Sequence, residues 1–134
     1  MNKLKIFTDG GARGNPGPAG CGAVIFNESG EIVGRHKLYL GEQTNNYAEY
    51  SGIVLALSEA KKLEAREIEL NLDSELAVKQ LNREYKVKNP ELAKLFVKVF
   101  NLAQSFKKVT YSHVPREMNK LADQLANEAM DDGQ

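Results

Sequence analysis

The sequence predicts a single α/β domain with a mixed sheet, and two observations carry this prediction. The first three strand-like segments are joined by short connections rich in glycine, asparagine and proline, which is typical of antiparallel neighbours. Two later strand-like segments are each preceded by helical segments, so helical crossovers are expected to make them parallel to the first strand. The expected order of elements is therefore βββαβααβα.

Five segments are predicted to be strands because apolar and β-branched residues alternate or run together in them between turn residues. They are Met1–Thr8, Gly20–Asn27, Glu31–Leu40, Glu67–Leu72 and Lys108–His113. Four segments are predicted to be helices from their apolar spacing and from capping residues. They are Asn46–Leu63, Asp73 to about Asn82, Asn89 to about Gln104, and Asn119–Met130. Residues 131–134 are expected to fray, and residues 1–134 to form one domain.

Composition and charge limit the classes of protein only loosely. The 134 residues include 18 basic and 18 acidic side chains, so no overall field favours nucleic acid or a membrane, although local patches can bind either. Cys21 is the only cysteine, which excludes an intrachain disulfide, and its apolar neighbours predict a buried thiol. No stretch resembles a signal peptide or a membrane span, and a cytoplasmic protein is expected.

The segment from Thr8 to Gly20 organises the chain. Asp9 follows the first predicted strand, at the carboxyl end where α/β sheets tend to place their chemistry. The eleven residues after it contain five glycines and two prolines, which exclude a helix and favour a turn into an antiparallel strand. On this evidence Asp9 is either a functional carboxylate or an ordinary turn residue.

Three further acids have comparable alternatives. Glu49 lies within the apolar stripe of its helix, where an unpaired carboxylate is costly, although its spacing from Asn46 also fits a capping box. Asp73 ends a strand and begins a helix, where aspartate often serves as the N-cap. Asp123 lies at the margin of the apolar face of the last helix, where an acid is usually solvated.

The predicted topology brings these four acids to the same end of the sheet. Such a cluster requires cations, because like charges raise each other's pKa values. Oxygen ligands without a histidine or cysteine cluster favour magnesium or manganese over zinc. Two such ions ~3.5–4 Å apart suit in-line displacement at phosphorus. The pattern therefore predicts a metal-dependent phosphodiesterase whose metal ligands and catalytic residues are Asp9, Glu49, Asp73 and Asp123.

Four motifs, in this order, resemble those of type 1 ribonuclease H, and the resemblance covers the chain from Lys3 to Met130. They are Thr8-Asp9-Gly10-Gly11 with Gly14-Asn15-Pro16-Gly17, Thr44-Asn45-Asn46-Tyr47-Ala48-Glu49, Leu72-Asp73-Ser74, and Asn119-Lys120-Leu121-Ala122-Asp123. The resemblance implies the ribonuclease H fold with strand order 3-2-1-4-5. It also implies an endonuclease that hydrolyses the RNA strand of RNA/DNA hybrids with two magnesium ions, or manganese in their place, and leaves 5′-phosphate and 3′-hydroxyl ends.

The resemblance further implies which residues contact the substrate. They are Gly10, Gly11, Asn15, Thr44, Asn45 and Asn46. The asparagines would read ribose hydroxyls and base edges in the minor groove, because amides both donate and accept hydrogen bonds. Thr44 would help hold a phosphate of the DNA strand. Helix capping is the alternative role for the segment 44–46.

The chain departs from several family members in one region. Those proteins carry an extra helix and a basic, tryptophan-containing handle between the second and third helices. Here the interval is Asn82–Asn89 and the chain has no tryptophan, which resembles the handle-less forms of archaea and some bacteria. Arg83, Lys86 and Lys88 form either a small phosphate-binding patch or a solvated loop. The protein is expected to be a monomer that binds RNA/DNA hybrids and does not associate with a membrane.

A residue that assists the metals is expected between the last strand and the last helix, where many relatives carry a histidine in a mobile loop. His113 could titrate near neutrality, but it ends a strand and precedes Val114-Pro115, which restricts its motion. Arg116 lies beyond the proline and could neutralise charge on the reacting phosphate. Arg116 is therefore the favoured accessory residue and His113 its rival.

Two other functions are compatible with the same pattern. Integrases, transposases and junction resolvases share the fold and the acids, and they act on DNA. A catalytically inactive hybrid-binding module is the second alternative, although all four acids are present.

Overall fold

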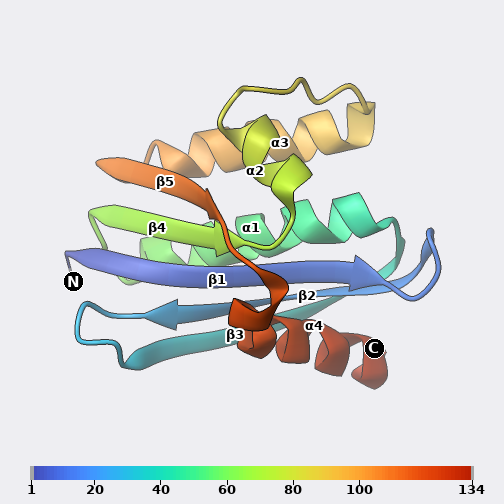
Figure 1. Ribbon diagram of the computed structural model, residues 1–134, viewed down its shortest axis with the longest axis horizontal. Helices are drawn as coiled ribbons and strands as arrows, with labels where there is room; N and C mark the ends of the chain where they lie inside the picture. The colour runs from blue at the N-terminus through green and yellow to red at the C-terminus, as the bar shows by residue number, and fades with distance from the viewer. Residues whose placement is uncertain (1, 134) are drawn as a thin grey trace.

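The computed structural model describes residues 2–133, which form one mixed sheet covered by helices (Figure 1). The five strands are β1 (Lys3–Ala12), β2 (Gly17–Phe26), β3 (Ile32–Gln43), β4 (Glu67–Leu72) and β5 (Lys108–His113). The helices are α1 (Asn45–Lys62), α2 (Glu75–Leu81), α3 (Pro90–Ala103) and α4 (Lys120–Asp132), with a short 3₁₀ helix η1 (Arg116–Met118) before α4. None of these helices is long and apolar enough to cross a membrane.

The strand order is β3-β2-β1-β4-β5, as predicted. β2 pairs antiparallel with both β1 and β3, whereas β4 is parallel to β1 and β5 is parallel to β4. The two sheet faces carry different helices. α1 and α3 lie on one face and α4 lies on the other, under β2 and β3 (Figure 1). The acids of α1 and α4 therefore approach β1 from opposite sides.

The main apolar core lies between the sheet and α1. Leu4 and Ile6 of β1 and Ile53 and Leu57 of α1 are fully buried there, because alternate strand residues and one helical stripe face each other. Cys21 is buried as predicted, and burial raises the pKa of its thiol to about 12. This core anchors α1, which carries Glu49.

β1 is longer than predicted, so Asp9 does not lie at the end of the strand. Antiparallel pairing with β2 continues from Asp9, opposite Gly22, to Ala12, opposite Ala19. The parallel pairing with β4 stops at Phe7. The glycines were expected to start the turn, but β2 begins at Gly17 and provides partners that keep them extended. Asp9 lies instead in the part of β1 that continues past its pairing with β4.

Two glycines let the flanking helices approach the sheet backbone closely. A Cβ atom at Gly10 would overlap the main-chain carbonyl of Ala48 in α1. A Cβ atom at Gly22 would lie 2.8 Å from the Ala122 carbonyl oxygen and 2.6 Å from Leu125 Cβ in α4. Glycine at these positions permits contacts that no other residue allows. The helices that carry Glu49 and Asp123 are thus held directly against β1 and β2.

The helix caps settle two of the alternatives raised for the acids. Thr44, and not Asn46, is the N-cap of α1, and its Oγ1 accepts from the Tyr47 N–H at 3.2 Å. Ser74, and not Asp73, caps α2 by accepting from the Ala77 N–H at 3.2 Å. The capping interpretations of Glu49 and Asp73 are therefore wrong. Both carboxylates are available for another role.

The end of the chain differs from the prediction. α4 continues to Asp132, two residues beyond the predicted end at Met130, and Gly133 adopts a left-handed conformation after it, whereas the expected fraying stays a prediction. Arg13 pairs with Asp131 at 2.7 Å, and Lys37 pairs with Asp132 at 3.1 Å. These exposed ion pairs join the last turn of α4 to β3 and to the β1–β2 turn. Gln134 lies outside the described residues.

Candidate active site

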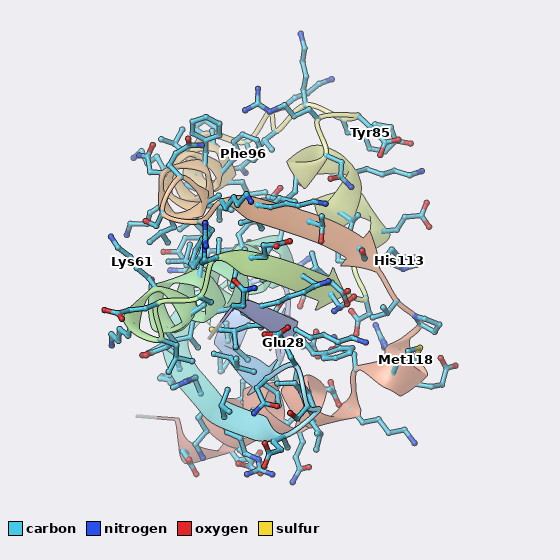
Figure 2. All side chains as sticks on the ribbon, turned by 90° about the vertical axis from the view of Figure 1, so that its left-hand side faces the viewer. Glu28, Lys61, Tyr85, Phe96, His113 and Met118 are labelled. Carbon is cyan, nitrogen blue, oxygen red and sulfur yellow. The ribbon has the colours of Figure 1, made fainter. Side chains whose placement is uncertain are left out.

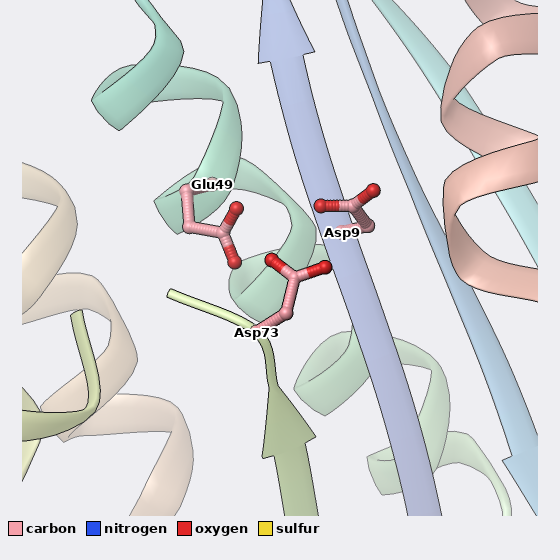
Figure 3. Close-up of side chains that lie close together, drawn as sticks. All are labelled: Asp9, Glu49 and Asp73. Carbon is pink, nitrogen blue, oxygen red and sulfur yellow. The ribbon is translucent and has the colours of Figure 1, made fainter. Parts of the chain in front are cut away.

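Three carboxylates from separate elements point toward one another at one end of the sheet (Figure 3). They belong to Asp9 of β1, Glu49 of α1 and Asp73 at the end of β4. Each offers an oxygen, and these oxygens all lie within 4.8 Å of one another. Glu49 is 7% exposed, which confirms that it faces the sheet. This spacing allows the three side chains to share a cation.

Strand register explains why Asp9 and Asp73 meet. Phe7 of β1 is the parallel partner of Asn71 in β4, so two further residues along each chain bring Asp9 level with Asp73. β4 ends at Leu72, and the chain turns away through Ser74 into α2. The Asp73 side chain therefore lies beside β1 without a further strand to cover it.

Asp123, the fourth predicted acid, is placed differently. It lies in the first turn of α4, is exposed and does not belong to the group of three. It lines the same cleft, however, and contributes to raising the pKa of Asp9. The structure thus brings all four acids to one cleft, with three close together and Asp123 at its α4 side.

The crowding of these acids shifts their pKa values upward. The pKa of Asp9 is raised from 3.8 to about 8, first by burial, then by the charge of Asp73 and by a hydrogen bond with the Asp123 carboxyl. Burial raises the pKa of Glu49 well above its usual range, and the charges of Asp9 and Asp73 add to this. The Gly10 backbone N–H opposes both upward shifts. A divalent cation bound among these acids would stabilise their ionised forms.

The cleft around the acids has a volume of about 490 Å³ and is lined by residues from β1, α1, α4 and η1. Arg116 of η1 lines it, whereas His113 is absent from the described residues that do so. Figure 2 shows His113 at the end of β5, of which it is the last residue. Of the two candidates for an assisting residue, the structure brings only Arg116 to the acids.

Comparisons with known proteins agree with this geometry. The family model described as reverse transcriptase-like matches residues 7–129. The crystal structure of RNase H1 from Halobacterium salinarum is 40% identical and has a TM-score of 0.95, with 98% of this chain and 99% of that chain covered. The chain belongs to the ribonuclease H1 family.

Two further solved ribonuclease H structures are similar over nearly the whole chain. The N-terminal RNase H domain of Rv2228c from Mycobacterium tuberculosis is 45% identical, with a TM-score of 0.96 and coverage of 99% of this chain and 96% of that chain. LC11-RNase H1 in complex with an RNA/DNA hybrid is 42% identical, with a TM-score of 0.92 and coverage of 96% and 97%. Full-length Rv2228c is named a bifunctional protein, and this chain spans 36% of its length.

The polar motif residues of this ribonuclease H1 chain interlock the β1–β2 turn with the start of α1. Asn15 Oδ1 accepts from the Asn45 backbone N–H at 3.1 Å, and Asn45 Oδ1 accepts from the Ala12 N–H at 2.8 Å. Because backbone donors occupy both oxygens, the Nδ2 groups of Asn15 and Asn45 are presented as donors. Asn45, Asn46 and Gly11 line the cleft beside the acids. Thr44 caps α1 and is an exposed residue.

One residue of the site was missed by sequence reasoning. Asn119 is 1% exposed, and its Nδ2 donates to Asp73 Oδ2 at 3.2 Å and to the Thr8 carbonyl at 2.8 Å. The sequence places it just before a helix, which is the signature of a cap, yet its side chain makes no cap hydrogen bond. No local signal marks it as buried, because its apolar sequence neighbours Met118 and Leu121 are themselves exposed.

The basic residues of the short loop lie far from this cleft. Tyr85 marks the loop between α2 and α3, at the opposite side of the molecule from α4 (Figures 1 and 2). Arg83 packs over the Phe100 ring, with its guanidinium carbon 5.2 Å from the ring centroid, so it is partly anchored. Lys86 and Lys88 are exposed. Their part in binding stays a prediction.

Proposed function

We propose that this chain hydrolyses the RNA strand of RNA/DNA hybrids, and that Asp9, Glu49, Asp73 and Asp123 hold two divalent cations for the reaction. The observation that carries this proposal is the convergence of three carboxylates within 4.8 Å in an open cleft. Membership of the ribonuclease H1 family and the similarity to LC11-RNase H1, which is described in complex with an RNA/DNA hybrid, support the substrate class.

The residues present fit a divalent cation. Glu49 Oε1 is buried and has no hydrogen-bond partner among the described residues, which leaves a carboxylate oxygen aimed into the group of acids. Burial, and then the charges of neighbouring acids, raise the pKa values of Asp9 and Glu49, and a bound cation would favour their ionised forms. An all-oxygen donor set favours magnesium, with manganese as a substitute. When bound, such ions supply an activated water and stabilise the leaving oxygen.

The chain's own groups orient the acids and the substrate. Asn119 holds the Asp73 carboxylate through its Nδ2, and the Gly10 backbone N–H acts to lower the pKa values of Asp9 and Glu49. Arg116 lines the cleft, and its guanidinium would offset charge that builds up on the phosphate. Together these groups keep the acids in position and offset the charge of the nucleic acid. The expected products carry 5′-phosphate and 3′-hydroxyl ends.

Selectivity for RNA is assigned to the amides. The Nδ2 groups of Asn15 and Asn45, fixed as donors by the contacts of their oxygens, suit the acceptor atoms of the minor groove and of the ribose 2′-hydroxyl. Asn46 adds a third amide beside them in the cleft. Gly11 leaves space there, because a Cβ atom would meet only Asn45 Oδ1, at 3.8 Å. Action as a monomer is part of this proposal.

The test is cleavage of a labelled duplex in the presence of magnesium. The same sequence is prepared as an RNA/DNA hybrid, as duplex DNA and as duplex RNA, and the products are resolved on a gel. We expect internal cuts in the RNA strand of the hybrid, none in duplex DNA, and loss of all cuts in a chelator or in Glu49→Gln. Equal cleavage of duplex DNA would favour an integrase- or resolvase-like nuclease. Binding of the hybrid without any cleavage would favour an inactive binding module.

A further inference from the structure

Arg13 is a cation in a cleft lined mainly by polar and acidic residues, and the roles assigned above do not use it. It follows β1 in the turn to β2, and its side chain is 48% exposed. It lines the cleft together with Asp9 and Asp123. Among the described residues that line this cleft, the other cation is Arg116. Arg13 therefore places positive charge at the α4 side of the acids.

Two contacts hold the guanidinium of Arg13 against the end of α4. Its Nη2 lies 2.7 Å from Asp131 Oδ1 and donates a longer hydrogen bond, 3.4 Å, to the Asn127 carbonyl oxygen. Asp131 lies in the last turn of α4, where the helix dipole disfavours a carboxylate. The Asp131 side chain is 64% exposed, and exposed ion pairs of this kind contribute little. Another anion could therefore replace Asp131 at Arg13.

We propose that Arg13 binds a backbone phosphate of the substrate beside the acids, and that Asp131 competes with this phosphate for the guanidinium. A guanidinium presents several N–H donors in a planar fork that fits a phosphate, and Nη2 alone makes both contacts described above. The inference rests on the proposed function, which supplies the polyanionic substrate. Asp131 then acts as an internal competitor that lowers the affinity for the hybrid.

The same helix end offers a matched control. Lys37 of β3 pairs with Asp132 at 3.1 Å and with Glu128 at 3.4 Å. This second ion pair also joins the sheet to the last turns of α4, but Lys37 is not among the described residues that line the cleft. Lys37→Ala and Asp132→Asn therefore remove a similar exposed contact away from the acids.

The experiment measures KM, kcat and the salt dependence of kcat/KM for cleavage of a labelled RNA/DNA hybrid with magnesium. Arg13→Ala is expected to raise KM roughly tenfold, as loss of a charge-assisted hydrogen bond does. It is also expected to make the slope of log kcat/KM against log salt shallower by about 0.9. Asp131→Asn is expected to lower KM roughly two- to fivefold. This gain should vanish in the Arg13→Ala background, and both control variants should keep a wild-type KM.

Three results would contradict these proposals in different ways. If Arg13→Ala and Asp131→Asn lower the melting temperature but leave KM and the salt slope at wild-type values, the pair is structural and the inference is wrong. If Asp131→Asn raises KM, Asp131 orients Arg13 and does not compete with the substrate. If the wild-type protein does not cleave the hybrid at all, the proposed function fails first.

Discussion

The amide of Asn119 joins the Asp73 carboxylate to the backbone of β1. Its Nδ2 donates to Asp73 Oδ2 at 3.2 Å and to the Thr8 carbonyl at 2.8 Å, although Asn119 is separated from both by more than forty residues along the chain. Asn119 directly precedes α4, which carries Asp123. One buried side chain therefore ties together three of the elements that place the acids.

Asn119→Ala is expected to reduce both stability and turnover. The Thr8 carbonyl would lose its donor in a buried position, which costs on the order of 1–3 kcal/mol in the free energy of unfolding. Asp73 would lose the group that orients it, so kcat should fall more than KM changes. Urea denaturation and steady-state kinetics measure the two effects. Full kcat in a folded Asn119→Ala protein would show that this amide does not position Asp73.

Asp9→Asn and Asp73→Asn are each expected to abolish turnover and to leave the fold intact. Each change removes a charge with almost no change in shape, so metal binding weakens while packing is kept. In the metal-free protein stability should rise, because fewer carboxylates repel one another. Circular dichroism, thermal melting and cleavage assays test this. Glu75→Gln, an exposed acid of α2 paired with Lys79, is the matched control and should remain active.

The metal-free protein is expected to lose stability as the pH rises. The pKa of Asp9 is raised from 3.8 to about 8 by burial and by neighbouring acids, so between these values the folded protein keeps a proton that the unfolded chain has lost. The free energy of unfolding therefore falls with increasing pH across this range, and the contribution of Asp9 is fully lost above it. Glu49, whose pKa is raised as well, acts in the same direction.

Urea denaturation in a chelator, at several pH values between about 4 and about 9, measures this dependence. Asp9→Asn should show a weaker dependence because it removes one of the titrating groups. Saturating magnesium should have a similar effect, because a cation favours the ionised acids. Stability that increases with pH over this interval would contradict the crowding of the acids.

Arg116→Ala is expected to lower kcat at every pH, because arginine keeps its charge throughout the accessible range. The guanidinium lines the cleft, whereas His113 lies at the end of β5. His113→Ala should therefore leave the shape of the pH–rate profile unchanged. A profile that becomes flat near neutrality in a folded His113→Ala protein would make His113 the assisting residue.

The short loop between α2 and α3 is expected to add little to affinity. With equal numbers of basic and acidic residues, the chain should neutralise few phosphates, on the order of three to five contacts at about 0.9 each in the salt slope. Lys86→Ala combined with Lys88→Ala should change this slope only slightly, since both residues lie at the opposite side from α4. A large decrease in the slope would reveal that the bound hybrid reaches this loop.

The sequence predicts elements best where local pattern and tertiary pairing agree. β4 and β5 have the predicted bounds, because alternating residues end at clear turn or helix signals in both. β1 extends four residues further than predicted, to Ala12, since pairing with β2 overrides the turn preference of its glycines. Asp131 and Asp132 extend α4 beyond Met130, and their ion pairs with Arg13 and Lys37, which are distant in sequence, cannot be seen in the local pattern.

In the candidate site, too, residues marked by a local pattern were predicted, and a residue placed by long-range contacts was not. Glu49 was predicted from an acid in an apolar stripe, and the structure confirms that it is buried beside Asp9 and Asp73. Asn119 was missed because the spacing that marks it also marks an ordinary cap, and only its long-range contacts reveal its role. The cytoplasmic location, the identity of the ion and the assisting role of Arg116 stay predictions, because they depend on partners outside the chain.

Because of the close contacts at Gly10 and Gly22, the distances between the acids depend little on the volume of the side chains in the apolar core. Main-chain atoms of α1 and α4 meet the backbone of β1 and β2 at these points, so the depth of each helix does not depend on how large the neighbouring side chains are. Substitution of core residues such as Ile53 or Leu57 by other apolar residues would then change the melting temperature more than the positions of the metal ligands. One added methyl group at Gly10 would have the opposite effect, because it moves Glu49 itself.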